Sequence, residues 1–172
     1  CQMLLDNPQV DTEQSVVTKE EPRLLTIFRD SDLPEGMNRE NLASFLHTHL
    51  RPYEDTKEDI LEGLAYALDQ EQNKGGFILL AMNQKTLVGA LVMLNTGMKG
   101  YVPEHLLLFV AVASEMRGRR IGAELIRKAQ KEAKGNIKLH VEYDNPARRL
   151  YQRLGFSSRY AEMRWTNESP NH

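Results

Sequence analysis

The sequence predicts a mixed α/β fold in which a central β-sheet is flanked by helices. Three observations predict it. Short β-rich runs alternate with segments of helical periodicity along the 172 residues. Two β-rich runs, FILLAM and LVGALVML, are joined by the polar turn NQKT and predict a β-hairpin within residues 77–94. The run EHLLLFVAV (residues 104–112) is apolar on both faces after its first two residues, as in a central strand covered on both sides, and it leads directly into a helix.

The first part of the chain predicts an arm, a strand and a pair of helices. Residues 1–22 are polar, contain two prolines and lack a sustained period, which indicates a flexible N-terminal arm. Residues 23–28 form a short apolar run that predicts a strand. Two helical patterns follow, one capped by Asn38 and one starting at Thr56, and both carry an apolar stripe. We expect residues 23–172 to form a single domain.

The second part of the chain predicts helix, strand, helix and strand. A helix is expected from Gly118 to about Lys134, and residues 136–143 alternate as a half-exposed strand. Asn145 is the predicted cap of the next helix, which Gly155 ends. The run FSSRYAEMRW (residues 156–165) predicts a last strand with an edge available for pairing, so we expect a monomer or a homodimer.

Composition excludes several classes of protein. The formal net charge of -2 and the pI near 6.2 argue against a general binder of nucleic acid or of anionic membranes. The one cysteine, Cys1, provides neither a disulfide framework nor a cysteine-rich metal site, and His47 and His49 have poor spacing for a shared metal. No apolar run approaches the roughly 20 residues that a spanning helix needs. We therefore expect a cytoplasmic protein with no metal and no membrane or nucleic-acid partner.

Three arginines stand where a helix N-terminus already carries positive potential. Arg117, Arg119 and Arg120 precede or begin the helix that follows residues 104–112. Gly118 and Gly122 would let a ligand approach the backbone, so the pattern indicates a site for a diphosphate. A solvated basic rim is the alternative. The spacing matches neither the dinucleotide-binding G-x-G-x-x-G pattern nor a P-loop.

Two motifs resemble the GCN5-related N-acetyltransferases (GNAT). The segment VAVASEMRGRRIGAELI is similar to their acetyl-CoA-binding motif, Q/R-x-x-G-x-G/A, with Arg117 in the first place, Gly122 in the last and Arg120 where the family usually has its first glycine. The segment DNPARRLYQRLGF (residues 144–156) resembles the family's N-x-x-A-x-x-L-Y-x-x-x-G-F pattern and aligns Tyr151 with its tyrosine. The resemblance implies a GNAT-type fold, with a splayed sheet of about six to seven strands and about four helices.

The resemblance also implies how acetyl-CoA is bound. The pantothenyl arm would lie along the backbone of Val110, Ala111 and Val112, and Asn145 would contribute from the next helix. The diphosphate would bind the residues Arg117, Gly118, Arg119, Arg120, Ile121, Gly122 and Ala123.

The implied reaction is direct transfer of an acetyl group, in a ternary complex, to a primary amine of a small molecule or a peptide. Tyr151 would protonate the departing thiolate. Glu104 is the favoured base, with His105, His140, Glu142 and ordered water as alternatives. A non-catalytic sensor of acyl-CoA is the competing hypothesis. Contact of the three arginines with nucleic-acid phosphates is a third, which the acidic pI opposes.

Overall fold

The structure is a computed structural model, and it describes residues 20–53, 55–71 and 74–169. Within these residues the sheet has five strands in the order β1-β2-β3-β4-β5. Neighbouring strands are antiparallel, except that β4 and β5 are parallel. The mixed sheet confirms the predicted fold class, although it has fewer strands than expected. The strands are β1 (Arg23–Ile27), β2 (Gly76–Asn83), β3 (Thr86–Asn95), β4 (His105–Val112) and β5 (Ile137–Leu139).

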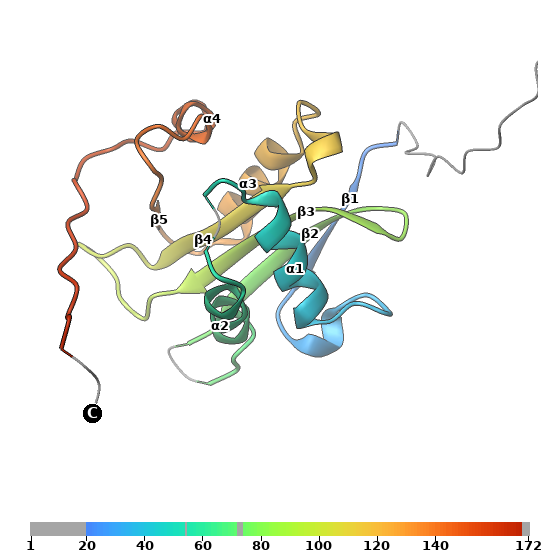
Figure 1. Cartoon of the computed structure of the whole chain (residues 1–172), viewed down its shortest axis with the longest axis horizontal. Coiled ribbons are helices and arrows are strands. Elements are labelled where there is room, and N and C mark those ends of the chain that lie inside the picture. Colours follow the sequence, from blue (N-terminus) through green and yellow to red (C-terminus); the bar gives the residue numbers. More distant parts are fainter. Residues whose placement is uncertain (1–19, 54, 72–73, 170–172) are drawn as a thin grey trace, which may run out of the picture.

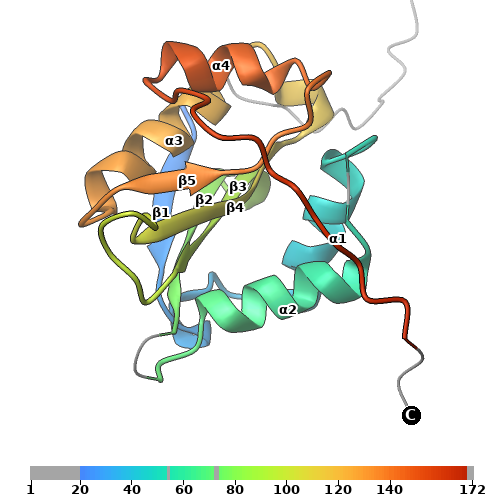
Figure 2. The same cartoon turned by 90° about the vertical axis from the view of Figure 1, so that its left-hand side faces the viewer.

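Helices cover both faces of the sheet. One face carries α1 (Arg39–His49) and α2 (Lys57–Ala67), and the other carries α3 (Ile121–Glu132) and α4 (Ala147–Arg153), as Figures 1 and 2 show. Short 3-10 turns precede α1 and α3, at Asp30–Asp32 and Ser114–Met116. Asn38 caps α1 as predicted, because its side chain accepts a hydrogen bond from the N–H of Asn41.

The sheet separates two apolar cores. Alternate residues of β2 point to opposite faces, so Ile78 and Leu80 pack in the core under α1 and α2, whereas Leu79 packs in the core under α3. Both faces of β2 and β3 are thus buried, which explains why their sequences are continuously apolar. The core residues of the helices include Leu42, Leu46, Ile60 and Leu64 on one face and Ile121, Leu125 and Ile126 on the other.

Three expectations about the elements need correction or fall outside the description. The last strand, predicted over residues 156–165, is wrong: this segment is extended but forms no strand with any described residue. An alternating pattern predicts a strand only where a neighbouring strand supplies hydrogen bonds, and here none lies alongside. The strand predicted over 136–143 pairs only at Ile137–Leu139. Residues 1–19 of the expected N-terminal arm lie outside the described residues.

Candidate functional site

β4 and β5 separate part-way along their length. They pair only between His105–Leu107 and Ile137–Leu139, while β4 continues to Val112. Within the described part of the chain, the edge of β4 that faces β5 has no strand partner beyond Leu107. Such an edge offers free backbone N–H and C=O groups to an extended ligand, much as it would to another strand. Val110, Ala111 and Val112 lie on this open part of β4.

A β-bulge marks the point of separation. The register between β3 and β4 shifts between Val92 and Met93, which leaves Leu108 without a partner in β3. A bulge bends its strand and increases the local twist, so it turns the end of β4 away from β5. Helix α2 lies directly against the bulge, because a Cβ added to Gly63 would be 2.6 Å from Leu108 Cδ2.

A tight loop, residues 113–120, connects the open end of β4 to α3. Gly118 (φ +80°) and Arg120 (φ +64°) both adopt the left-handed conformation, which reverses the chain direction. Arg120 is the N-cap residue of α3, yet its side chain makes no capping hydrogen bond. The first N–H groups of α3 therefore lack a side-chain cap, and they carry the positive potential of the helix N-terminus. They belong to Ile121, Gly122 and Ala123.

Charge and space around this loop suit an anion. Arg117, Arg119 and Arg120 are all exposed. A Cβ added to Gly122 would lie 3.7 Å from the side chains of Val112 and Leu150, which is an ordinary contact distance. Packing within the chain does not require glycine there, and the Cα of Gly122 faces the end of β4. We conclude that the loop fits a ligand with several phosphate oxygens.

The side chain of Arg117 is held by α1. Its Nη2 donates a hydrogen bond to the backbone carbonyl of His49, with 2.8 Å between the atoms. The N–H of Ser114 donates to Nδ1 of His49 at 3.3 Å, and the His49 ring packs on Phe45 with 4.6 Å between ring centroids. Hydrogen bonds of Arg117 and Ser114 to His49 thus join the last turn of α1 to the loop that precedes α3.

Tyr151, on α4, packs against the same core cluster as Val110 and Val112. Its ring meets that of Phe156 edge-to-face at 5.9 Å. Burial, and secondly the negative charge of Glu142, raise the pKa of Tyr151 to about 12. The hydroxyl therefore keeps its proton at neutral pH. It makes no hydrogen bond to any residue of 20–53, 55–71 or 74–169.

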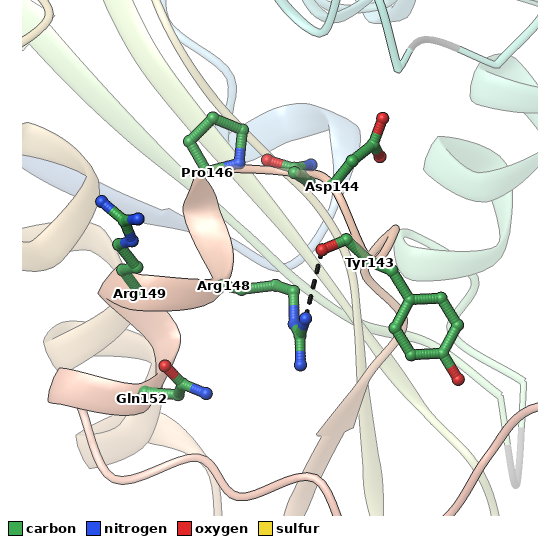
Figure 3. A pocket seen from close by; sticks show the side chains of 7 residues that line it. Tyr143, Asp144, Pro146, Arg148, Arg149 and Gln152 are labelled. Atoms are coloured by element: carbon green, nitrogen blue, oxygen red, sulfur yellow. Dashed lines mark hydrogen bonds between the residues drawn. The ribbon is translucent and has the colours of Figure 1, made fainter.

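Two hollows border α4. The smaller, of about 210 Å³, lies between α3 and α4 and includes Arg120, Arg127 and Arg153 in its lining. Because Arg120 also belongs to the loop, this hollow extends the positive charge of the loop toward α4. The larger, of about 430 Å³, lies where β5 leads into α4 (Figure 3). Its lining residues are Tyr143, Asp144, Asn145, Pro146, Arg148, Arg149 and Gln152.

A model of the Acetyltransferase (GNAT) family matches residues 37–156 of the chain. The chain belongs to this family. The matched region contains the open end of β4, the loop before α3 and Tyr151, so the features described above lie within the family's domain. Membership of the GNAT family makes acetyl transfer the general chemistry of this protein and acyl-CoA its donor.

Solved structures confirm the GNAT fold. An aminoglycoside N-acetyltransferase in complex with CoA aligns with a TM-score of 0.63 and 14% identity, over 89% of this chain and 99% of that one. A GNAT family acetyltransferase from Streptococcus pneumoniae aligns at 0.58 and 18%, over 86% and 98%. A transcriptional regulator from Bacillus halodurans aligns at 0.58 and 20%, over 84% and 100%. No curated protein sequence matches the chain.

Glu104 lies at the other end of β4 from the loop of this GNAT domain. Its Oε2 accepts a hydrogen bond from the N–H of Asn136 at 2.7 Å, and its carboxyl group lies against Gly135. Hydrogen bonds from its own backbone N–H and from that of Asn136 lower the pKa of Glu104. These contacts stabilise the turn between α3 and β5, and a lowered pKa makes the carboxylate a weaker base.

Asn145 lies just before α4 in the GNAT domain. Its Oδ1 accepts a hydrogen bond from the N–H of Ala147 at 2.9 Å, at the start of α4. Its Nδ2 donates to Glu142 Oε2 at 3.1 Å. The N-cap residue of α4 is Pro146 rather than the predicted Asn145, which lies one residue earlier and bonds to the first residue of the helix. Asn145 also lines the larger hollow beside the site.

The structure brings most of the predicted site residues to one end of the sheet, and Glu104 to the other. Sequence reasoning missed the links from α1 and its following loop: His49 to the loop before α3, and Tyr53, whose hydroxyl donates to the carbonyl of Asp144 at 3.4 Å. No local pattern marks either residue, because each partner is more than 60 positions away.

Among the described residues no helix is long and apolar enough to cross a bilayer, and no group of three His, Cys, Asp or Glu is placed to hold a metal.

Proposed function

We propose that this GNAT protein is an acetyl-CoA-dependent N-acetyltransferase that acts on a primary amine of a small molecule or a peptide. One observation carries the proposal. The end of β4, which among the described residues has no strand partner on its β5 side, meets the N-terminus of α3, which has no side-chain cap, at a loop with three exposed arginines. A ligand with an extended amide-bearing arm and a diphosphate matches both halves of this site, and acetyl-CoA is such a ligand.

In this proposal the backbone of Val110, Ala111 and Val112 binds the pantothenyl arm as a further strand would. The diphosphate accepts hydrogen bonds from the first turn of α3 and from the guanidinium groups of Arg119 and Arg120. Arg117 contributes through its backbone, since His49 holds its side chain. The remaining contacts come from Gly118, Ile121, Gly122, Ala123 and Asn145.

Acetyl-CoA supplies the acetyl group as a thioester. The neutral amine attacks the carbonyl carbon, so that a C–N bond forms and the C–S bond breaks. A backbone N–H of β4, such as that of Val110, stabilises the negative charge that develops on the carbonyl oxygen. Tyr151 donates its proton to the departing sulfur. The amine loses one proton, and Glu104 receives it. We propose a water relay for this transfer, because Glu104 lies at the other end of β4 and its carboxylate already binds the N–H of Asn136.

We propose a cationic amine as the acceptor. The hydrogen bond from Tyr53 to Asp144 joins the loop after α1 to the loop after β5. Burial, and then the negative charges of Asp144 and Glu142, raise the pKa of Tyr53, so two carboxylates lie near this junction. An ammonium group would be attracted there. The aminoglycoside N-acetyltransferase among the similar structures is named for an amine-bearing acceptor, which agrees with this choice.

Calorimetric titration with acetyl-CoA tests the binding half of the proposal. The unaltered protein should bind one equivalent, and an Arg119→Glu, Arg120→Glu double variant should bind more than ten-fold more weakly, since charged hydrogen bonds contribute about 1.5–3 kcal/mol each. A Lys99→Glu variant is the control, because Lys99 lies on the loop before β4, at the far end of the strand. Equal affinity for all three proteins would refute the assignment of the diphosphate site.

Turnover distinguishes the enzyme from the competing acyl-CoA sensor. Release of free thiol is followed with a panel of primary amines that includes polyamines, amino sugars and peptides. The proposal expects turnover that falls in Tyr151→Phe while acetyl-CoA affinity is unchanged. Tight binding without turnover on any amine would favour the sensor.

A further inference from the structure

The larger hollow beside α4 is lined by arginines that take no part in the proposed reaction. Its volume is about 430 Å³, within the roughly 300–1,000 Å³ of sites for small molecules. Figure 3 shows Arg149 and Gln152 on one side of the hollow, Tyr143 and Asp144 on the other, and Arg148 between them. The hollow therefore offers both signs of charge to a ligand.

The chain holds the guanidinium group of Arg148 in one orientation. Its Nη1 donates a hydrogen bond to the backbone carbonyl of Tyr143 at 3.1 Å, and the guanidinium carbon lies 5.6 Å from the centroid of the Tyr143 ring. Within the described residues this side chain makes no other hydrogen bond, so most of its five N–H donors are free. A guanidinium group fixed in this way loses little entropy when it binds a carboxylate.

The other charged groups of the hollow also lack partners in the described part of the chain. The side chains of Arg149, Gln152 and Asp144 make no hydrogen bond or ion pair with any described residue. Opposite charges thus line one hollow without pairing with each other. A ligand with both an ammonium group and a carboxylate would complement both signs of charge, whereas the carboxylate of Asp144 would repel a dianion such as a phosphate more strongly than a carboxylate.

The hollow adjoins the junction where we place the acceptor amine. The carbonyl of Asp144, a lining residue, accepts the hydrogen bond from Tyr53 at 3.4 Å. Asn145, another lining residue, donates to Glu142 at 3.1 Å. Burial, and secondly the charge of Glu142, raise the pKa of Tyr151, so this carboxylate lies near the proposed acid as well. An acceptor whose amine reaches the thioester can therefore extend into the hollow.

We propose that the hollow binds a carboxylate of the acceptor, so that the substrate is an amine with an acidic group, such as a short peptide with an acidic residue close to its N-terminus. Arg148 binds the carboxylate through paired hydrogen bonds, and Arg149 and Gln152 donate further ones. The ammonium group lies toward Asp144 before it loses its proton. This inference rests on the proposed acetyl transfer, and it narrows the acceptor from a cationic amine to a zwitterionic one.

Matched peptides test this preference. Each pair has a free N-terminal amine and carries either glutamate or glutamine at the second, third or fourth position, so the two members differ by one charge. At least one glutamate peptide should have a KM about ten-fold below that of its glutamine partner, because hydrogen bonds between charged groups are the strong ones. Equal KM values in every pair would overturn the proposal.

Substitutions assign the preference to the hollow. Arg148→Gln should raise the KM of the glutamate peptide about ten-fold, and Arg148→Lys should retain part of the preference, because lysine keeps the charge but not the paired hydrogen bonds. The effect should lie in KM rather than in kcat, since the carboxylate binds away from the reacting atoms. Arg149→Gln is a second variant with the same expected direction, and its side chain has no partner in the described structure to lose.

Arg23→Gln is the matched control. Arg23 is an exposed arginine of β1, at the opposite edge of the sheet from β5, and its removal should leave the preference intact. If Arg148→Gln and Arg149→Gln keep the full preference, or if Arg23→Gln loses it as they do, the hollow is not the carboxylate site.

Calorimetric titration of the same peptides in the presence of excess CoA separates failure of this inference from failure of the proposed reaction. A glutamate peptide that binds about ten-fold more tightly than its glutamine partner, and only while Arg148 is present, supports the site even where no peptide is acetylated. Turnover of both peptides with equal KM and equal affinity overturns the site and leaves acetyl transfer standing. Weaker binding of acetyl-CoA by Arg148→Gln also overturns it, because the hollow would then belong to the phosphates of the cofactor.

Discussion

Arg120 adopts a backbone conformation that favours glycine, and this leads to a prediction with two opposite effects. Its φ is +64°, and it precedes the first turn of α3. The place is the one where the resemblance to the GNAT motif puts a glycine. We expect Arg120→Gly to stabilise the fold and at the same time to weaken the binding of acetyl-CoA, because the variant relieves the backbone but removes a guanidinium group from the site.

The expected gain in the free energy of unfolding is about 1 kcal/mol. A left-handed conformation costs a residue with a side chain about 1–2 kcal/mol, and removing a cation from the positive end of a helix gains about 0.3–1 kcal/mol. The greater freedom of glycine in the unfolded chain costs about 0.4–1 kcal/mol in the other direction. For a chain of this size the net gain corresponds to a rise in Tm of about 2–4 °C.

Arg119→Gly is the control for this prediction. Arg119 is the adjacent exposed arginine, and its φ is not in the left-handed region. Replacing Arg119 by glycine removes one positive charge and increases the conformational freedom of the unfolded chain, as Arg120→Gly does, but it relieves no backbone strain. Urea unfolding should therefore place Arg120→Gly about 1–2 kcal/mol above Arg119→Gly. If the two variants have equal stability, the argument from backbone strain is refuted.

Three further predictions concern Tyr151, Glu104 and Gly76. A pKa raised to about 12 means that the folded state holds the Tyr151 proton after the unfolded state has lost it, so stability falls as pH rises from about 10 to 12. Tyr151→Phe should show roughly 2–3 kcal/mol less of that alkaline loss in denaturant titrations at several pH values. The lowered pKa of Glu104 stabilises the fold above the ordinary pKa of the group, and this stabilisation is lost as pH falls below it. Glu104→Gln should therefore lower Tm at neutral pH, and it should also lower kcat because Glu104 receives the amine proton in the proposed reaction. Gly76→Ala should cost more than about 3 kcal/mol, since its Cβ would be 1.9 Å from the carbonyl oxygen of Met93, whereas Gly100→Ala, with open space, should cost about 1 kcal/mol.

Local patterns were sufficient to predict the elements whose partners are close in sequence or whose burial is complete. The hairpin of β2 and β3 has its turn residues between two apolar runs, and α1 and α2 have both caps and stripes. The last strand was predicted wrongly because residues 156–165 have the alternation of a strand without a neighbour in the chain itself. Alternation reports two unlike faces, but whether a second strand lies alongside is decided by tertiary structure.

The candidate site was predictable in part. The loop before α3 is local in sequence, so the arginines, Gly118 and Gly122 could be placed together. The bulge at Leu108 could not, because it depends on the register between β3 and β4. The environment of Glu104 also depends on a distant contact: the N–H of Asn136, 32 residues later, binds its carboxylate. Alternation along β4 placed Glu104 on a face, but it carried no information about this partner.

The link from His49 to the loop has a consequence for the order of binding. The carbonyl of His49 and its ring both bond to the loop, through Arg117 and Ser114. A ligand that fixes the conformation of the loop therefore also fixes the last turn of α1. The loop that follows α1 carries Tyr53, whose hydroxyl bonds to Asp144 at the junction where we place the acceptor. If acetyl-CoA binds first, it orders the acceptor side before the amine arrives, and the two substrates should bind with positive coupling. His49→Ala removes the ring contact to Ser114 but keeps the backbone carbonyl that binds Arg117, so it should weaken that coupling while sparing the affinity for acetyl-CoA alone. Titrations with and without an acceptor amine measure both quantities directly.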